Sequence, residues 1–71
     1  MISDRPFIVD RWYLWSDGEL RKQRFRYPTQ EDAEHVCIAY LEMRDTTRIR
    51  LSKDSRYSNK PTVIKVWEKG M

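Results

Sequence analysis

The chain has 71 residues, enough for one small domain with a modest hydrophobic core. Its nine aromatic residues exclude a disordered chain, because disordered segments are poor in aromatic residues. A single cysteine excludes an internal disulfide, and no apolar run in the sequence is long enough to span a bilayer. We therefore expect a cytoplasmic protein with no membrane contact.

A β-hairpin is predicted near the start of the chain. Its first strand, residues 7–16, is rich in β-branched and aromatic residues, and its second, residues 19–27, alternates in character. Between them, Asp17-Gly18 predicts a two-residue type I′ turn, since that turn needs positive φ at both central positions.

A helix is predicted to begin after Thr29 and to end near Arg44. Thr29 is a favourable N-cap, and Asp32 stands at the acidic position of a capping box. The segment 29–45 carries five acids and one base, so negative charge gathers on this element. One apolar stripe follows the helical spacing, and its members are Ala33, Val36, Cys37, Tyr40 and either Leu41 or Met43.

Two more strands are predicted, at residues 48–52 and 62–68, with a mobile basic loop at 53–61 between them. The loop's basic and aromatic members are Lys53, Arg56, Tyr57 and Lys60. The order ββαββ predicts an α+β fold, a four-stranded antiparallel sheet with one helix packed on one face. Residues 1–71 form a single small domain in this interpretation, with residues 1–6 as an N-terminal tail.

The predicted two-residue turn determines which side chains share a face of the sheet. The pairs that it implies are Trp15–Leu20, Tyr13–Lys22 and Arg11–Arg24. The face towards the helix then gathers Ile8, Trp12, Leu14, Phe25, Tyr27, Ile49, Leu51, Ile64 and Val66. The bare face gathers seven bases and three aromatic residues, namely Arg11, Tyr13, Trp15, Lys22, Arg24, Arg26, Arg48, Arg50, Lys65 and Trp67. A three-residue turn with a bulge would instead move one arm to the opposite face.

A basic and aromatic sheet face is typical of nucleic-acid binding. Bases neutralise phosphates and release counterions, and exposed rings stack on unpaired bases, each stack contributing about 1–3 kcal/mol. We interpret the bare face as a binding site for DNA or RNA. Two alternatives stay open: the bases are simply solvated, or they bind an acidic protein or nucleoprotein surface. Ile38 is a candidate protein contact, and exposed sheet edges could pair two copies into a homodimer.

No catalytic group is predicted, and we expect a protein that is not an enzyme. His35 and Cys37 are two residues apart on the helix, so their side chains diverge and cannot act as a nucleophile–base pair. One cysteine and one histidine do not make a zinc site, and two glycines do not make a phosphate-binding loop. We expect no catalytic residue, no metal and no cofactor.

The run RWYLWSDGELRKQRFRYPTQEDAEHVCIAYLEM, residues 11–43, resembles the arm-type DNA-binding domain of phage tyrosine integrases, an AP2-like fold. The similarity lies in a Trp-containing strand, a turn, a strand ending in aromatic residues, and Thr-x-x-Asp-Ala-Glu opening a helix. It implies DNA contact in the major groove by the strand residues Arg21, Lys22, Arg24 and Arg26.

In size and build, the chain also resembles the small proteins of phages and mobile elements that inhibit host machinery, anti-CRISPR proteins among them. This resemblance implies a regulator or inhibitor that docks on a host protein or nucleoprotein complex in the host cytoplasm.

Overall fold

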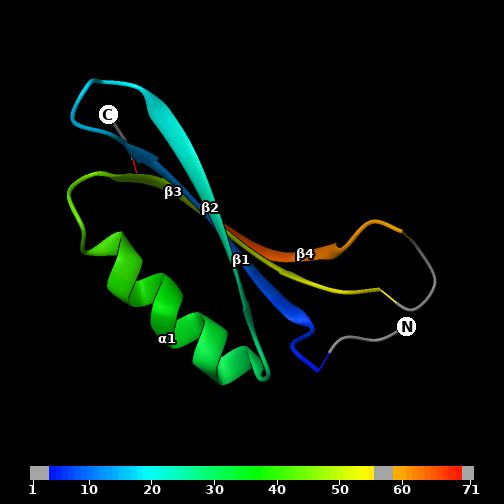
Figure 1. Ribbon diagram of the computed structural model, residues 1–71. Helices are drawn as coiled ribbons and strands as arrows, with labels where there is room; N and C mark the ends of the chain where they lie inside the picture. Colours follow the sequence, from blue (N-terminus) through cyan, green and yellow to red (C-terminus); the bar gives the residue numbers. More distant parts are fainter. Residues whose placement is uncertain (1–3, 56–58, 70–71) are drawn as a thin grey trace.

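The computed structural model describes residues 4–55 and 59–69, which form one sheet and one helix (Figure 1). The elements in chain order are β1 (Phe7–Leu14), β2 (Leu20–Tyr27), α1 (Gln30–Leu41), β3 (Thr46–Lys53) and β4 (Thr62–Glu68). The strands are antiparallel to their neighbours and lie in the order β2-β1-β3-β4. The predicted α+β fold, with its ββαββ order, is confirmed.

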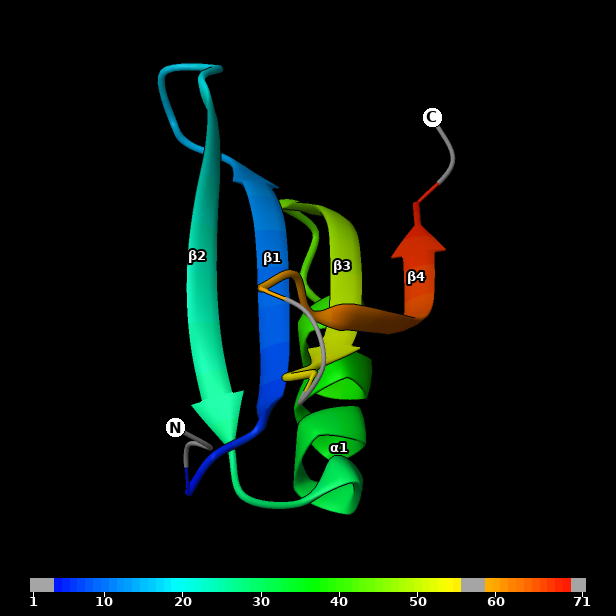
Figure 2. The ribbon, with the colours of Figure 1, turned by 90° about the vertical axis from the view of Figure 1, so that its right-hand side faces the viewer.

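The helix covers one face of the sheet. It packs against β3, β1 and β2, and β4 lies farther from it than these three strands do (Figure 2). The loop end of the β3–β4 hairpin extends away from the helix (Figure 1). The sheet therefore has a helix-covered face and a helix-free face, with β2 and β4 at its two edges.

The turn between β1 and β2 differs from the prediction by one residue. The Trp15 amide donates to the Glu19 carbonyl at 2.9 Å, and the Gly18 amide donates back to the Trp15 carbonyl at 2.8 Å. Gly18 has a φ of +83°, and no other described residue has a positive φ. Asp17 therefore does not adopt the left-handed conformation that a type I′ turn requires, and three residues close the loop.

This difference reverses the predicted faces of β1. The observed pairs include Leu14–Leu20, Trp12–Lys22 and Asp10–Arg24, one residue out of step with the predicted ones. Because side chains alternate along a strand, a shift of one residue exchanges the two faces. The prediction that Ile8, Trp12 and Leu14 face the helix is therefore wrong.

The core between sheet and helix contains Val9, Ala33, Cys37, Ile49 and Leu51, with Phe7, Tyr27, Tyr40, Leu41 and Trp67 packed around it. Phe25 stacks on Tyr40 with ring centroids 5.6 Å apart. The predicted core roles of Phe25, Tyr27, Ile49 and Leu51 are confirmed. Those of Ile64 and Val66 are wrong, since these residues lie on the edge strand β4 with 39% and 38% of their surfaces exposed.

The helix begins where the sequence predicts and ends earlier. Thr29 is extended, with φ −130°, and its hydroxyl accepts a hydrogen bond from the Asp32 amide at 3.2 Å. The helix stops at Leu41 rather than near Arg44. The amides of Glu42 and Met43 donate to the carbonyls of Ala39 and Tyr40. The Asp45 carbonyl accepts from the Leu14 amide at 2.8 Å, which joins the segment after the helix to β1.

The predicted basic loop begins one residue later than expected, because β3 includes Lys53. Arg56 and Tyr57 lie outside the described residues. At the start of this loop, the Asp54 amide donates to the Pro6 carbonyl at 2.9 Å, which anchors the chain just before β1. Within the described residues, no helix has the length and apolar character needed to cross a bilayer.

Candidate functional site

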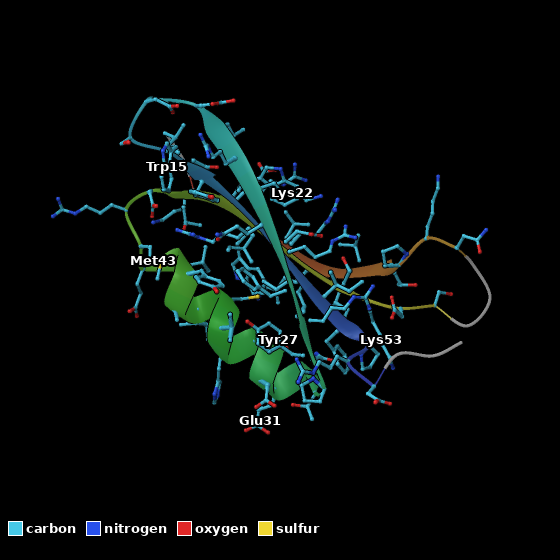
Figure 3. The ribbon with its side chains drawn as sticks, in the orientation of Figure 1. Trp15, Lys22, Tyr27, Glu31, Met43 and Lys53 are labelled. Carbon is cyan, nitrogen blue, oxygen red and sulfur yellow. The ribbon has the colours of Figure 1, made fainter. Side chains whose placement is uncertain are left out.

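The helix-free face of the sheet brings together five bases around two residues of the central strand β1. We call this set the basic face; it comprises Asp10, Trp12, Lys22, Arg24, Arg26, Arg48 and Arg50. The strand register explains the arrangement, because Asp10 pairs with Arg24 on one side and Arg50 on the other. Trp12 likewise pairs with Lys22 and Arg48. Figure 3 shows Lys22 on the side of the sheet away from α1.

Asp10 is a buried carboxylate at the centre of the basic face, with 1% of its surface exposed. Its Oδ1 accepts from Arg24 Nε at 2.8 Å, and its Oδ2 accepts from Arg50 Nε at 3.3 Å and Nη2 at 3.1 Å. Lys22 Nζ lies 3.8 Å from Oδ1. Burial by itself raises the pKa of this carboxyl, but the hydrogen bonds from Arg24 and Arg50 and the nearby positive charges outweigh it, so the pKa lies below its ordinary value.

Trp12 is half-buried beside Asp10, and cations cover its ring. The charged groups of Lys22, Arg48 and Arg50 lie 5.1, 5.0 and 5.2 Å from the ring centroid. Such contacts are favourable because the face of an indole ring carries negative charge density. The bases of the basic face are thus held by a carboxylate and by an aromatic ring.

Two further acids contact the margin of the basic face. Arg26 Nη1 donates to Asp54 Oδ2 at 2.8 Å, and Arg48 Nε lies 3.6 Å from Glu68 Oε1. The five bases of the basic face therefore contact three acids, Asp10, Asp54 and Glu68, and retain an excess of positive charge. Arg24 binds Asp10 through Nε alone, and its two terminal nitrogens donate to no described residue.

Half of the predicted binding residues lie on the basic face, and half do not. The predicted positions of Lys22, Arg24, Arg26, Arg48 and Arg50 on the helix-free face are correct. The remaining five lie on the helix side of the sheet, namely Arg11, Tyr13, Trp15, Lys65 and Trp67. The one-residue change in the hairpin moves the β1 residues, and the pairs Leu51–Lys65 and Ile49–Trp67 place the β4 residues on the helix side.

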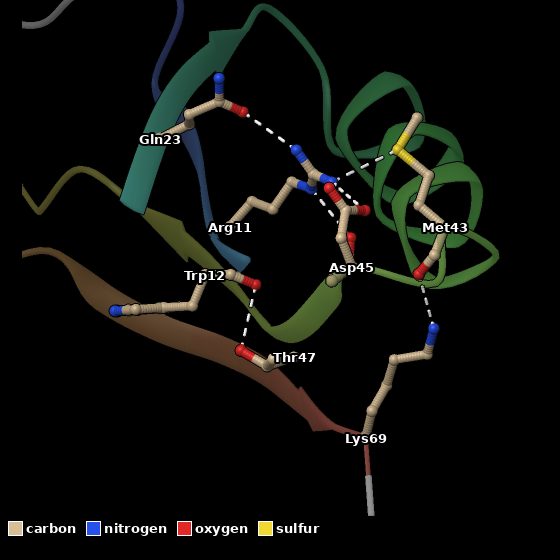
Figure 4. A network of polar contacts seen from close by, with 8 residues as sticks. Arg11, Trp12, Gln23, Met43, Asp45, Thr47 and Lys69 are labelled. Carbon is tan, nitrogen blue, oxygen red and sulfur yellow. Dashed lines mark hydrogen bonds and ion pairs between the residues drawn. The ribbon is translucent and has the colours of Figure 1, made fainter. Parts of the chain in front are cut away.

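Arg11 lies in a buried network of polar contacts and not on the basic face (Figure 4). It is 7% exposed and donates to Thr46 Oγ1 at 2.8 Å, Asp45 Oδ1 at 2.9 Å and Gln23 Oε1 at 3.1 Å. Its guanidinium also lies over the rings of Tyr13 and Tyr40, 4.6 and 5.1 Å from their centroids. Arg11 thereby joins both sheet neighbours of β1 to the connection that follows the helix.

The other displaced aromatic residues also have partners on the helix side. Trp15 is 49% exposed, meets Tyr13 edge-to-face at 6.2 Å, and has the Arg21 guanidinium 4.9 Å from its ring centroid. Lys65 Nζ lies 4.9 Å from the ring centroid of Trp67, and Trp67 packs against the core. None of these residues joins the basic face.

Sequence reasoning missed Asp10 and Trp12 as the organising residues of the basic face. Asp10 is the one acid in a strand whose other residues, apart from Arg11, are apolar or aromatic, which is a signal that it has cationic partners. Only the register shows which ones, because Arg50 is forty residues away in the sequence.

Cys37 is fully buried in the core, as predicted, and burial together with the charge of Glu34 raises the pKa of its thiol to about 11. Ile38 is 55% exposed on the acidic helix. Among the described residues, no group of three or more His, Cys, Asp or Glu side chains is placed to hold a metal ion.

Comparison of the chain with family models, with curated proteins and with solved structures finds no match. The resemblance to integrase arm domains stays a prediction. The functional argument therefore depends on the geometry and charge of the basic face.

Proposed function

We propose that this protein binds nucleic acid through the basic face, by contacts with the phosphate backbone. The observation that carries this proposal is the convergence of five bases from two strands on one face, in excess of the acids that contact them. Lys and Arg side chains grouped in this way neutralise phosphates and release condensed counterions, which gives affinity without sequence preference.

The positions of the aromatic rings favour phosphate contacts over base stacking. Stacking requires a ring with an accessible face. The ring of Trp12 is surrounded by three cationic groups, Tyr13 is 8% exposed, and Trp15 and Trp67 lie on the helix side. The stacking role inferred from the sequence for Tyr13, Trp15 and Trp67 is therefore not part of the proposal.

The distribution of charge between the two layers supports one orientation on a polyanion. The exposed acids Glu31, Asp32 and Glu34 belong to the helix, on the opposite side of the sheet from the basic face. A polyanion is attracted to one side and repelled from the other, so the helix faces away from the nucleic acid.

The test compares two double variants that remove the same charge from opposite faces. Lys22→Gln/Arg26→Gln acts on the basic face and leaves both arginines that hydrogen-bond Asp10 in place. Arg21→Gln/Lys65→Gln removes two charges from the helix side. Binding is measured by fluorescence anisotropy with random-sequence DNA and RNA over a range of salt concentrations, after thermal melting has shown that both variants fold.

We expect the first variant to bind more weakly and the second to bind like the wild-type protein. Loss of two phosphate contacts lowers the slope of log affinity against log salt by about 2. If the wild-type protein does not bind at low salt, the proposal fails and an acidic protein partner takes its place. Equal losses in both variants would also contradict it, because bulk charge would then explain the binding.

A further inference from the structure

We propose that Asp10 is a positioning residue, which orients Arg24 and Arg50 so that their remaining N–H groups form one binding site for a phosphodiester anion. This inference rests on the proposed function of the basic face. It assigns a role in anion binding to a carboxylate, the side chain that simple electrostatics would exclude from such a site.

The burial of Asp10 gives the first argument. An ionised carboxylate removed from water is costly unless charged or hydrogen-bonding partners compensate it. Here Arg24 and Arg50 supply three hydrogen bonds from two different strands, at 2.8 to 3.3 Å. The lowered pKa of Asp10 keeps it ionised at neutral pH, so these contacts persist under physiological conditions.

The way in which each arginine binds Asp10 gives the second argument. Arg24 uses Nε and keeps both terminal nitrogens, and Arg50 uses Nε and Nη2 and keeps Nη1. A guanidinium is planar, so fixing one of its edges fixes the direction of the other donors. Arginine donors held in a fixed orientation bind phosphate oxygens without the entropic cost of ordering the side chains on binding.

The third argument is that, of the three acids that contact the basic face, Asp10 is the one whose carboxylate binds arginines from both sides. Arg24 and Arg50 belong to β2 and β3, which are separated by β1, and both bind the carboxylate between them. The acids at the margin, Asp54 and Glu68, do not lie between β2 and β3 in this way. Glu68 lies 3.6 Å from Arg48 alone, and 69% of its side chain is exposed.

The contrast between Asp10 and Glu68 provides the experiment. Asp10→Asn and Glu68→Gln each remove one negative charge next to the basic face, and each conserves side-chain size. Affinity and salt slope are measured by fluorescence anisotropy with a random-sequence DNA duplex, and folding is checked by thermal melting. A third variant, Arg50→Lys, keeps the charge and removes the planar donor edge, with Arg26→Lys as its control at the margin of the basic face.

We expect Glu68→Gln to bind about twofold more tightly, because it removes a weakly paired and exposed negative charge. We expect Asp10→Asn to bind about five- to tenfold more weakly and with a smaller salt slope, although its net charge is more positive. Arg50→Lys should be weakened more than Arg26→Lys.

Each result decides the inference. If folded Asp10→Asn binds as tightly as the wild-type protein or more tightly, Asp10 only opposes the ligand and the inference is wrong. If Asp10→Asn does not fold, the two lysine variants decide, and equal affinities for them overturn the inference. These outcomes leave the proposed function intact, whereas wild-type protein that fails to bind DNA at low salt contradicts both.

Discussion

Asp10 and Cys37 are both almost inaccessible to solvent, yet burial leaves one of them charged and the other neutral. Asp10 faces the bases of the helix-free face, whose hydrogen bonds outweigh the cost of desolvation. Cys37 lies among apolar residues, with the negative charge of Glu34 nearby. The nature of the neighbouring charge therefore decides the ionisation of a buried group in this protein.

We expect Cys37 to be unreactive in the folded protein. A thiol pKa of about 11, against an ordinary value of 9.0, lowers the thiolate fraction at pH 8 by roughly a hundredfold, and the side chain is also inaccessible. The rate of labelling by a disulfide reagent at pH 8 checks this, with protein unfolded in urea as the control. Labelling of native protein as fast as that of unfolded protein would show that Cys37 is accessible.

At the scale of elements, the sequence was sufficient to locate every strand and the helix, but not to fix the register of the hairpin. Gly18 is needed both in a type I′ turn and in the three-residue turn that forms, so the Asp-Gly pair does not distinguish them. The apolar pattern is equally ambiguous, because large apolar side chains occupy both faces of β1. Ile8 and Trp12 lie on one face, and Val9 and Tyr13 lie on the other.

Long-range contacts resolve this ambiguity. The observed register places Asp10 between Arg24 and Arg50, and it places Val9 in the core beside Leu51. The predicted register would have directed Asp10 towards the helix, away from its cationic partners. Sequence reasoning placed the five bases on the helix-free face correctly because β2 and β3 alternate clearly. It failed for Arg11, Tyr13 and Trp15, which depend on the turn.

The turn gives a stability prediction. Gly18 has a φ of +83°, and a Cβ added there would meet no atom within 4 Å, so the cost of Gly18→Ala is conformational alone. We expect it to lower the free energy of unfolding by about 1–2 kcal/mol. Gly18→Asn should cost less, because Asn tolerates the left-handed region better than Ala does. Urea unfolding measures both, and equal stability of Gly18→Ala and wild type would contradict this account of the turn.

At the scale of the whole molecule, the two edges of the sheet differ in character. The edge strand β2 carries four bases, Arg21, Lys22, Arg24 and Arg26, which discourage pairing with another copy. The other edge strand, β4, contributes Trp67 to the core and exposes Val63, Ile64 and Val66. Such an edge is suited to pairing with a further strand.

We therefore expect self-association through β4 rather than β2. Antiparallel pairing of two β4 strands about a two-fold axis normal to the sheet would place both basic faces on the same side. Sedimentation at increasing protein concentration tests for the dimer. Val66→Lys should give a monomer, and Leu20→Lys on the opposite edge should not change the association. A wild-type protein that stays monomeric at high concentration would exclude this mode of pairing.

The bridging position of Asp10 also has a kinetic consequence. Its contact with Arg24 closes a local hairpin, but its contact with Arg50 spans forty residues and forms only when β3 docks beside β1. Closing the longer loop costs more chain entropy and comes later in folding. During synthesis, a chain that ends before β3 has a hairpin but lacks Arg48 and Arg50, two of the five bases of the basic face. Binding competence should therefore be acquired in one late step rather than grow with chain length.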